Sequence, residues 1–150
     1  RPCQGWLSQA VITAVEAGPQ NLRVYGVLLR AGAVLMSTEH VAGRDVLKFP
    51  GGGVEPGETP EAALCREFQE EGGLEIALIG LLHVPGTLFS PWTLAPYTPL
   101  YYRVASEGNL CIPDHESLTL GFMTPEDAIR TARMAEPEIE ALRRALRTEL

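Results

Sequence analysis

Short runs of apolar and β-branched residues recur along the first fifty positions of the chain. The runs at residues 9–16 (QAVITAVE) and 22–30 (LRVYGVLLR) predict two strands separated by the turn AGPQN. The break at Ala31-Gly32 is followed by the segment AVLMSTEH (33–40). This segment is predicted to form a hairpin with the strand at 22–30. DVLKFP (45–50) predicts a further short strand that ends where three glycines follow its proline.

A helical signature follows this glycine-rich turn. Thr59, Pro60 and Glu61 supply an N-cap hydroxyl, a proline at the first helical position and an acid in the first turn. The pair Gly72-Gly73 predicts the end of the helix, since glycine readily adopts the left-handed conformation of a C-cap. We therefore expect a helix between these two signals.

The second half of the chain alternates between strand and loop signals and closes on helices. Strands are predicted within residues 75–88, 100–105 and 117–123, and the three prolines of SPWTLAPYTP (90–99) predict a loop between the first two. This order of elements lacks the regular alternation of a parallel βαβ fold. It predicts the α/β class, with a mixed sheet covered by helices.

Two helices are predicted at the end of the chain. Thr124 and the proline after it open the first by the same capping logic, and Glu136 and its following proline open the second. In the second helix, Ile139, Leu142 and Leu146 are spaced as an apolar stripe. This stripe is expected to pack on the sheet.

Composition and charge narrow the class of partner. A chain of 150 residues with 45% hydrophobic residues fits one domain over residues 1–150. The 12 basic and 19 acidic residues give a net charge of −7, which argues against duplex nucleic acid as a partner. No apolar run is long enough to span a membrane. Three widely spaced cysteines favour free thiols and a cytoplasmic location.

Acidic residues gather on one side of the predicted helix. At about 100° per residue, Glu67, Glu70 and Glu71 share one face, while Leu64 and Phe68 occupy the adjoining arc toward the sheet. Like charges at this spacing repel each other by roughly 0.2–0.5 kcal/mol per pair. A hard divalent cation such as Mg²⁺, which takes oxygen ligands, would offset this repulsion. A solvated acidic helix face is the alternative.

A phosphate-binding loop of the P-loop type is excluded. The stretch GGVEPGET (52–59) fits G-x-x-x-x-G-K-[ST] except at Glu58, which stands where the lysine is required. The substitution reverses the charge that would face the phosphates.

The stretch from Gly52 to Leu74 resembles the Nudix box, G-x5-E-x7-R-E-U-x-E-E-x-G-U, in which U is a bulky apolar residue. Every fixed position is met, and seven fixed identities at fixed spacing are a specific signal. The segments KFPGG before the box and GFMTPEDA near the end of the chain also look like family features. The matching positions are Gly52, Glu58, Arg66, Glu67, Phe68, Glu70, Glu71, Gly73 and Leu74.

This resemblance implies a Nudix fold, an α/β/α sandwich with a mixed sheet flanked by helices. It also implies an enzyme that uses Mg²⁺ or Mn²⁺ to hydrolyse the pyrophosphate linkage of a nucleoside diphosphate joined to another moiety. The segment FPGGGVEPGET is similar to that of small MutT-like members that act on nucleoside triphosphates. The substrate is therefore expected to be a small nucleotide.

The resemblance also implies roles for single residues. Glu67, Glu70 and Glu71 would ligate the metal, and Arg66 and Glu58 would orient those carboxylates. One of Glu70 and Glu71, or a glutamate from another loop, would accept the proton of the attacking water.

Candidates outside the helix are less sharply defined by the sequence. Glu116, in the loop before the last predicted strand, is a candidate additional metal ligand or base, and an exposed loop acid is the alternative. Gly51 and Gly52 are candidates for substrate contact because a glycine turn allows the backbone to approach a ligand closely, and an ordinary turn is the alternative. Lys48 is a candidate because it lies close to the box in sequence, and a solvent-exposed charge is the alternative. Trp92 could stack on a nucleobase or only pack its loop.

A second functional class is a Nudix-fold module that binds a nucleotide or metabolite as a sensor without cleaving it. Such modules often lose box carboxylates, whereas this chain keeps them. Family members are often dimers, so the resemblance leaves a homodimer open.

Overall fold

The structure, a computed structural model, describes residues 21–90, 93–113 and 119–148. The strand predicted at 9–16 lies outside these residues. In chain order, the elements are β1 (Leu22–Arg30), β2 (Ala33–Val41), β3 (Arg44–Lys48), β4 (Gly51–Gly53), α2 (Pro60–Gly72), β5 (Ala77–His83), β6 (Leu88–Ser90), β7 (Ala95–Ala105), β8 (Thr119–Met123), α3 (Pro125–Arg130) and α4 (Glu136–Thr148).

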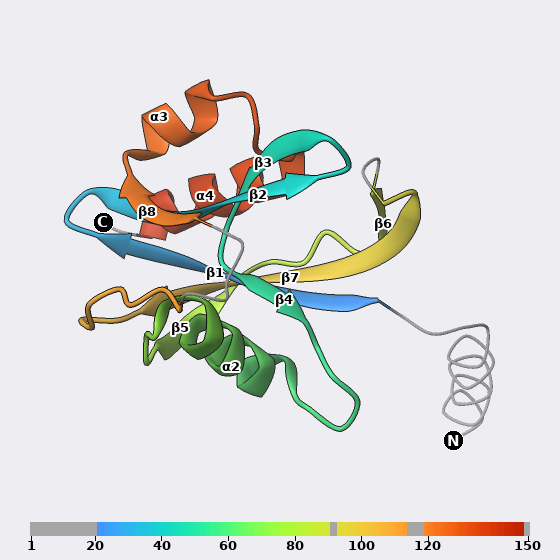
Figure 1. The fold of residues 1–150 in the computed structure, drawn as a ribbon, viewed down its shortest axis with the longest axis horizontal. Helices are drawn as coiled ribbons and strands as arrows, with labels where there is room; N and C mark the ends of the chain where they lie inside the picture. The colour runs from blue at the N-terminus through green and yellow to red at the C-terminus, as the bar shows by residue number, and fades with distance from the viewer. Residues whose placement is uncertain (1–20, 91–92, 114–118, 149–150) are drawn as a thin grey trace, which may run out of the picture.

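The strands form one mixed sheet. Its main path runs β3-β2-β1-β7-β5, with β4 paired to β1, β6 to β7 and β8 to β2. Among the described strands, β1 and β7 are the one parallel pair, and the other pairs are antiparallel. Figure 1 shows α2 on one side of the sheet and α3 and α4 on the other. The predicted α/β class and the sandwich of helices around a mixed sheet are confirmed.

Strand β1 divides the core into two layers through its alternating side chains. Val24 and Leu28 are buried in the cluster that α2 covers. Tyr25 and Val27 are buried in the other cluster, which α4 covers. This period of two is what a strand buried on both faces requires. The central strand therefore fixes the positions of both helical layers.

The predicted helix at the end of the glycine-rich turn is confirmed as α2. The hydroxyl of Thr59 accepts a hydrogen bond from the Ala62 amide at 3.1 Å, which satisfies one free donor of the first turn. Gly73 ends the helix with a φ of 63°. Leu64 and Phe68 are fully buried against the sheet. The acidic face of α2 is thereby turned toward β4.

The loop predicted at residues 90–99 is wrong over its second half. Strand β7 already begins at Ala95, and it forms a hairpin with β6. Pro96, opposite Phe89, lies in the part of β7 that pairs with β6 and not yet with β1. Proline has no backbone N–H to donate within a sheet, so it is tolerated mainly where a strand lies at the edge of the sheet, as here.

Two further expectations need correction. The strand signal at residues 75–88 divides into β5 and β6, because the segment that contains Pro85 and Gly86 breaks it. In α4, Ala141, Leu142 and Ala145 are fully buried, whereas Leu146 is exposed. The buried face of α4 therefore includes Leu142 as predicted, but its other fully buried members are Ala141 and Ala145, and Leu146 lies outside it.

Candidate functional site

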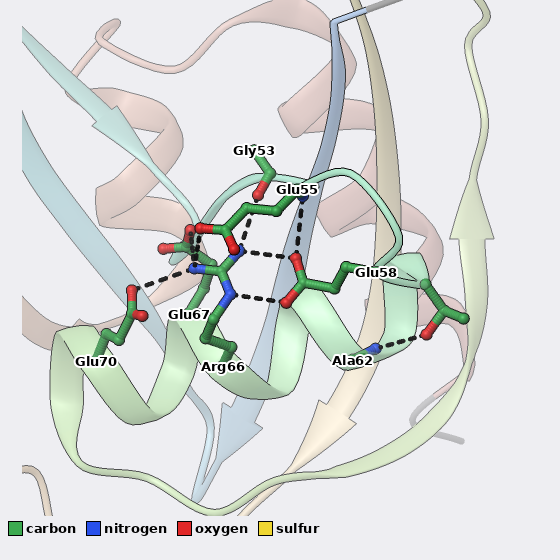
Figure 2. A network of polar contacts seen from close by, with 8 residues as sticks. Gly53, Glu55, Glu58, Ala62, Arg66, Glu67 and Glu70 are labelled. Atoms are coloured by element: carbon green, nitrogen blue, oxygen red, sulfur yellow. Dashed lines mark hydrogen bonds and ion pairs between the residues drawn. The ribbon is translucent and has the colours of Figure 1, made fainter.

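The turn between β4 and α2 is held to the helix by one arginine. Arg66 donates from Nε and Nη2 to both carboxylate oxygens of Glu58, at 2.8 and 3.0 Å, and Nη2 also donates to the carbonyl oxygen of Gly53 at 3.0 Å. Figure 2 shows the guanidinium at the centre of this network. The hydrogen bonds from Arg66 lower the pKa of Glu58 to about 2. The turn therefore has a fixed position relative to α2.

The same guanidinium contacts two acids of the helix. Nη1 of Arg66 lies 3.2 Å from Glu67 Oε1 and 3.2 Å from Glu70 Oε2 (Figure 2). Arg66 therefore offsets part of the repulsion between these two carboxylates. The spacing of residues along the helix does not by itself reveal this contact. The expected contact between Arg66 and the acidic residues is present. Glu70 is the outermost of the acids, with 53% of its side chain exposed.

Glu71 is the buried member of the acidic group. Its side chain is directed toward β4, where the Gly51 amide donates to Glu71 Oε2 at 3.3 Å. Burial, and then the charges of Glu67 and Glu39, raise the pKa of Glu71 to about 8. A single weak donor does not compensate for removing a carboxylate from water. Glu71 therefore lies where a cation would stabilise its charged form.

Gly52 gives Glu67 the room it occupies. A Cβ at this glycine would lie 2.5 Å from Glu67 Oε1, far inside normal contact distance. Burial raises the pKa of Glu67, opposed by the charge of Arg66. Gly51 and Gly52 thus both contact the acidic helix directly, one through its amide and one through its missing side chain. Whether they also contact substrate stays a prediction.

The chemistry of these side chains suits a hard divalent cation. Glu67, Glu70 and Glu71 offer only carboxylate oxygens, the ligands that Mg²⁺ prefers. Within the described ranges, however, no three His, Cys, Asp or Glu side chains converge as a ready metal site. The Arg66 guanidinium lies between Glu67 and Glu70 instead. The donor set fits a metal, and Arg66 occupies the place between two of its members.

A cavity of about 270 Å³ opens beside this group. The charged and aromatic residues that line it come from both halves of the sheet and from α4: Arg23, Tyr25, Glu39, Lys48, Tyr97, Tyr101 and Glu138. Lys48 Nζ lies 3.0 Å from Glu39 Oε2, and Arg23 Nε donates to the Tyr25 hydroxyl at 2.8 Å. The predicted candidate Lys48 is therefore part of this cavity.

The cavity and the acidic helix are electrostatically coupled. Burial raises the pKa of Glu71, and the ammonium of Lys48 opposes this rise. Burial opposes the rise in the pKa of Arg23, which is due first to Tyr25 and then to the charge of Glu67. Such effects require the charged groups to lie near one another. The described residues thus bring together an acidic edge and an aromatic, partly cationic cavity.

Sequence reasoning reached only part of this site. Trp92 and Glu116 lie outside the described residues, so both stay predictions. Glu138, Tyr25 and Tyr101 were missed. A signal for Glu138 exists in the sequence, because it is an acid on the apolar face of α4, three residues before Ala141.

A family model with the description NUDIX domain matches residues 19–149. The chain belongs to the NUDIX domain family. The matched region contains the acidic helix, the cavity and every described element. The box resemblance and the family assignment therefore agree.

Relatives of this NUDIX domain include an RNA pyrophosphohydrolase of Halorhodospira halophila, 34% identical over 108 residues, which are 68% of this chain and 54% of that protein. An RNA pyrophosphohydrolase of Pseudomonas putida is 48% identical over 52 residues, 33% of this chain and 31% of that protein. The chain thus spans about half of the first relative's length.

Solved structures share the fold of this NUDIX domain. A NUDIX hydrolase from Nitrosomonas europaea has a TM-score of 0.73 at 20% identity, covering 87% of this chain and 90% of that chain. A MutT NUDIX hydrolase from Burkholderia pseudomallei has a TM-score of 0.67 at 21% identity, covering 85% and 98%. No helix among the described residues is long and apolar enough to cross a bilayer.

Proposed function

We propose that this NUDIX domain is a metal-dependent pyrophosphohydrolase that cleaves the pyrophosphate linkage of a nucleoside diphosphate joined to another group. The observation that carries the proposal is the position of Glu71. Its carboxylate is buried, accepts a hydrogen bond from Gly51 and lies near Glu67 and near the charges of Glu39 and Lys48, which line the aromatic cavity. The buried, closely spaced carboxylates do not stabilise the fold. Binding of a cation and a pyrophosphate would explain why these acids lie together.

Each acidic residue has a distinct part in the proposed site. Glu67, Glu70 and Glu71 would hold Mg²⁺ or Mn²⁺ through their carboxylate oxygens. When bound, the cation would neutralise the charge of the pyrophosphate and lower the pKa of the attacking water. Glu70 or Glu71 accepts the water's proton. Glu116 is a further proposed ligand outside the described residues.

The neighbouring residues position these groups. Arg66 and Glu58 fix the turn on the helix and direct Glu67 and Glu70, as their hydrogen bonds indicate. Lys48 contributes a positive charge on the cavity side, where a phosphate or base would approach. Held in this way, the reacting groups lose little orientational freedom when substrate binds.

Two substrate classes fit this proposal. The box segment is similar to that of members acting on nucleoside triphosphates, and the relatives in Halorhodospira and Pseudomonas are named RNA pyrophosphohydrolases. The cavity of about 270 Å³ lies just below the roughly 300–1,000 Å³ of typical small-ligand pockets. It suits a nucleobase or nucleoside, with the phosphates outside it, in either class.

A non-catalytic sensor is the second candidate function. It would use the same cavity for a nucleotide and the same acids for a cation without turnover. The retained carboxylates favour hydrolysis, since a sensor has no need of a proton acceptor. Nucleotide binding without product formation would identify the sensor.

The decisive experiment compares wild type with Glu71→Gln on a substrate panel with and without Mg²⁺. The panel holds nucleoside triphosphates, nucleotide sugars, dinucleoside polyphosphates, NADH, coenzyme A and RNA with a 5′-triphosphate. We expect wild type to hydrolyse the pyrophosphate linkage of at least one of them only when the metal is present, giving two products that each carry part of the cleaved linkage as phosphate. Glu71→Gln should lower turnover by at least about 10²-fold, the loss typical of disturbed metal sites.

Glu75→Gln is the matched control, because Glu75 is an exposed acid four residues after Glu71 and lies beyond the end of α2. Its turnover and metal affinity should equal those of wild type. Undiminished activity of Glu71→Gln, with an unchanged melting temperature, would contradict the assignment of Glu71. Metal titration by calorimetry gives a second readout that needs no substrate.

Cellular location and assembly are two further proposals. Cys65 and Cys111 carry free, exposed thiols, which suits the reducing cytoplasm. A homodimer is proposed by analogy with the family. Cell fractionation and light scattering test these two points separately.

A further inference from the structure

A carboxylate at the start of α4 is buried in the wall of the cavity. Glu138 is the third residue of this helix, is only 6% exposed and lines the cavity together with residues of β1, β3 and β7. The Ala135 amide donates to Glu138 Oε2 at 3.1 Å, which caps the helix. An ionised carboxylate has about four acceptor positions, so the cap uses only part of its capacity.

Glu138 shares the lining of the cavity with two phenols, those of Tyr97 and Tyr101. Burial, and then the charge of Glu138, raises the pKa values of both tyrosines. The ammonium of Lys48, at the end of β3, opposes the rise in the pKa of Glu138. The carboxylate therefore lies among the polar atoms that a ligand in the cavity would meet.

Among the residues that the structure describes, none forms an ion pair with Glu138. Lys48 Nζ forms its ion pair with Glu39 at 3.0 Å. Burial of the Glu138 carboxylate raises its pKa to about 7. A buried carboxylate is retained at a cost in stability unless donors reach it. A ligand with N–H groups directed at the wall of α4 would provide them.

Among nucleobases, guanine alone has two adjacent N–H donors on one edge, N1–H and the 2-amino group. Adenine and cytosine place an acceptor beside their amino group, and uracil places its single N–H between two carbonyls. We propose that Glu138 is a specificity residue that selects guanine nucleotides by accepting hydrogen bonds from this edge, with the base among Tyr25, Tyr97 and Tyr101. The inference rests on the proposed function in taking the cavity as the nucleoside site.

Binding of mononucleotides tests the inference without any hydrolysis. GMP, IMP and AMP lack a pyrophosphate linkage, and IMP differs from GMP only by the missing 2-amino group. We expect the wild-type protein to bind GMP about 10-fold or more tightly than IMP or AMP, since one well-paired base edge discriminates by about this factor. Calorimetry or tyrosine fluorescence measures the three affinities.

Glu138→Gln tests the residue itself. Glutamine keeps an oxygen for the Ala135 amide and nearly the same volume, so the helix cap is preserved. It replaces one acceptor with an NH₂ group, which opposes the 2-amino group of guanine and suits the donor and acceptor of adenine. The variant should lose the preference for GMP over IMP and gain affinity for AMP. The control Glu136→Gln changes an exposed acid of the same turn and should behave as wild type.

The possible results separate this inference from the proposed function. Equal affinities for GMP, IMP and AMP, or no binding of any, would overturn the guanine assignment even if the protein hydrolyses nucleotides. An equal loss of all three affinities in Glu138→Gln would overturn it too, because that pattern indicates contact with the sugar or phosphate. A GMP preference that reverses in Glu138→Gln supports it even if no substrate is cleaved.

Discussion

The carboxylate of Glu67 lies directly against the backbone of Gly52, where a Cβ would come within 2.5 Å of Oε1. This contact joins β4 to the acidic face of α2. The glycine turn, expected from the sequence to let backbone approach a ligand, thus first lets the backbone approach one of the protein's own carboxylates. The position of Glu67 is therefore set by the absence of a side chain at residue 52.

Gly52→Ala should displace the Glu67 carboxylate and reduce turnover. The contacting atoms are the far end of a flexible side chain, so Glu67 can move and the fold should persist. A displacement of about 1 Å at a reacting group can cost roughly 10²-fold in rate. Steady-state kinetics and thermal unfolding check both parts. Gly80→Ala, with open space around its Cβ, is the control and should change neither.

Arg66→Lys should lower activity although the charge is kept. Arg66 binds both oxygens of Glu58 and also reaches Gly53 and two acids of α2, which a lysine ammonium cannot do. We expect turnover to fall by about 10–100-fold, as for other residues that orient metal ligands. The control Arg130→Lys alters an exposed ion pair with Asp127. Equal kinetics for the two variants would show that the guanidinium fork has no positioning role.

Thr59→Ala should weaken α2 at its start. The hydroxyl of Thr59 accepts the Ala62 amide, and loss of such a cap lowers the free energy of unfolding by about 1 kcal/mol. Urea unfolding measures the change. Thr59→Ser retains the acceptor and should recover most of the lost stability. A serine variant as unstable as the alanine variant would indicate that the threonine methyl group, and not the cap, is responsible.

Sequence reasoning succeeded where structure is decided locally. The caps of α2, Thr59 and Gly73, are short-range signals, and the helix they predict is the helix observed. The acidic face follows from the same helical period. Its placement against β4, by contrast, depends on the contact of Glu67 with Gly52, which joins residues fifteen positions apart in the chain.

The cavity could not be predicted because it is made by tertiary contacts. Tyr25 comes from β1, Tyr101 from β7 and Glu138 from α4, and only the sheet order brings them together. The proline-rich segment at residues 90–99 was predicted as loop because prolines usually break strands. Its pairing with β6, which admits Pro96, is a property of the assembled sheet.

The stability of the protein should depend on pH through Glu138. Its pKa is raised from 4.5 to about 7 by burial, so between these values the folded state binds a proton that the unfolded state has released. The free energy of unfolding therefore falls as pH rises through this window, and the full loss is reached above about pH 7. Glu138→Gln removes this loss and keeps the helix cap.

The difference in unfolding free energy between Glu138→Gln and wild type should consequently grow with pH. It should be smallest at pH 5 and reach on the order of 3 kcal/mol in favour of the variant at pH 8, as the rise in pKa from 4.5 to about 7 requires. Glu71, which also has a raised pKa, is present in both proteins and cancels in the difference. Urea unfolding at pH 5, 6, 7 and 8, with Glu136→Gln as reference, makes the measurement. A difference that does not change with pH would mean that the Glu138 carboxylate is as well solvated in the folded chain as in the unfolded one.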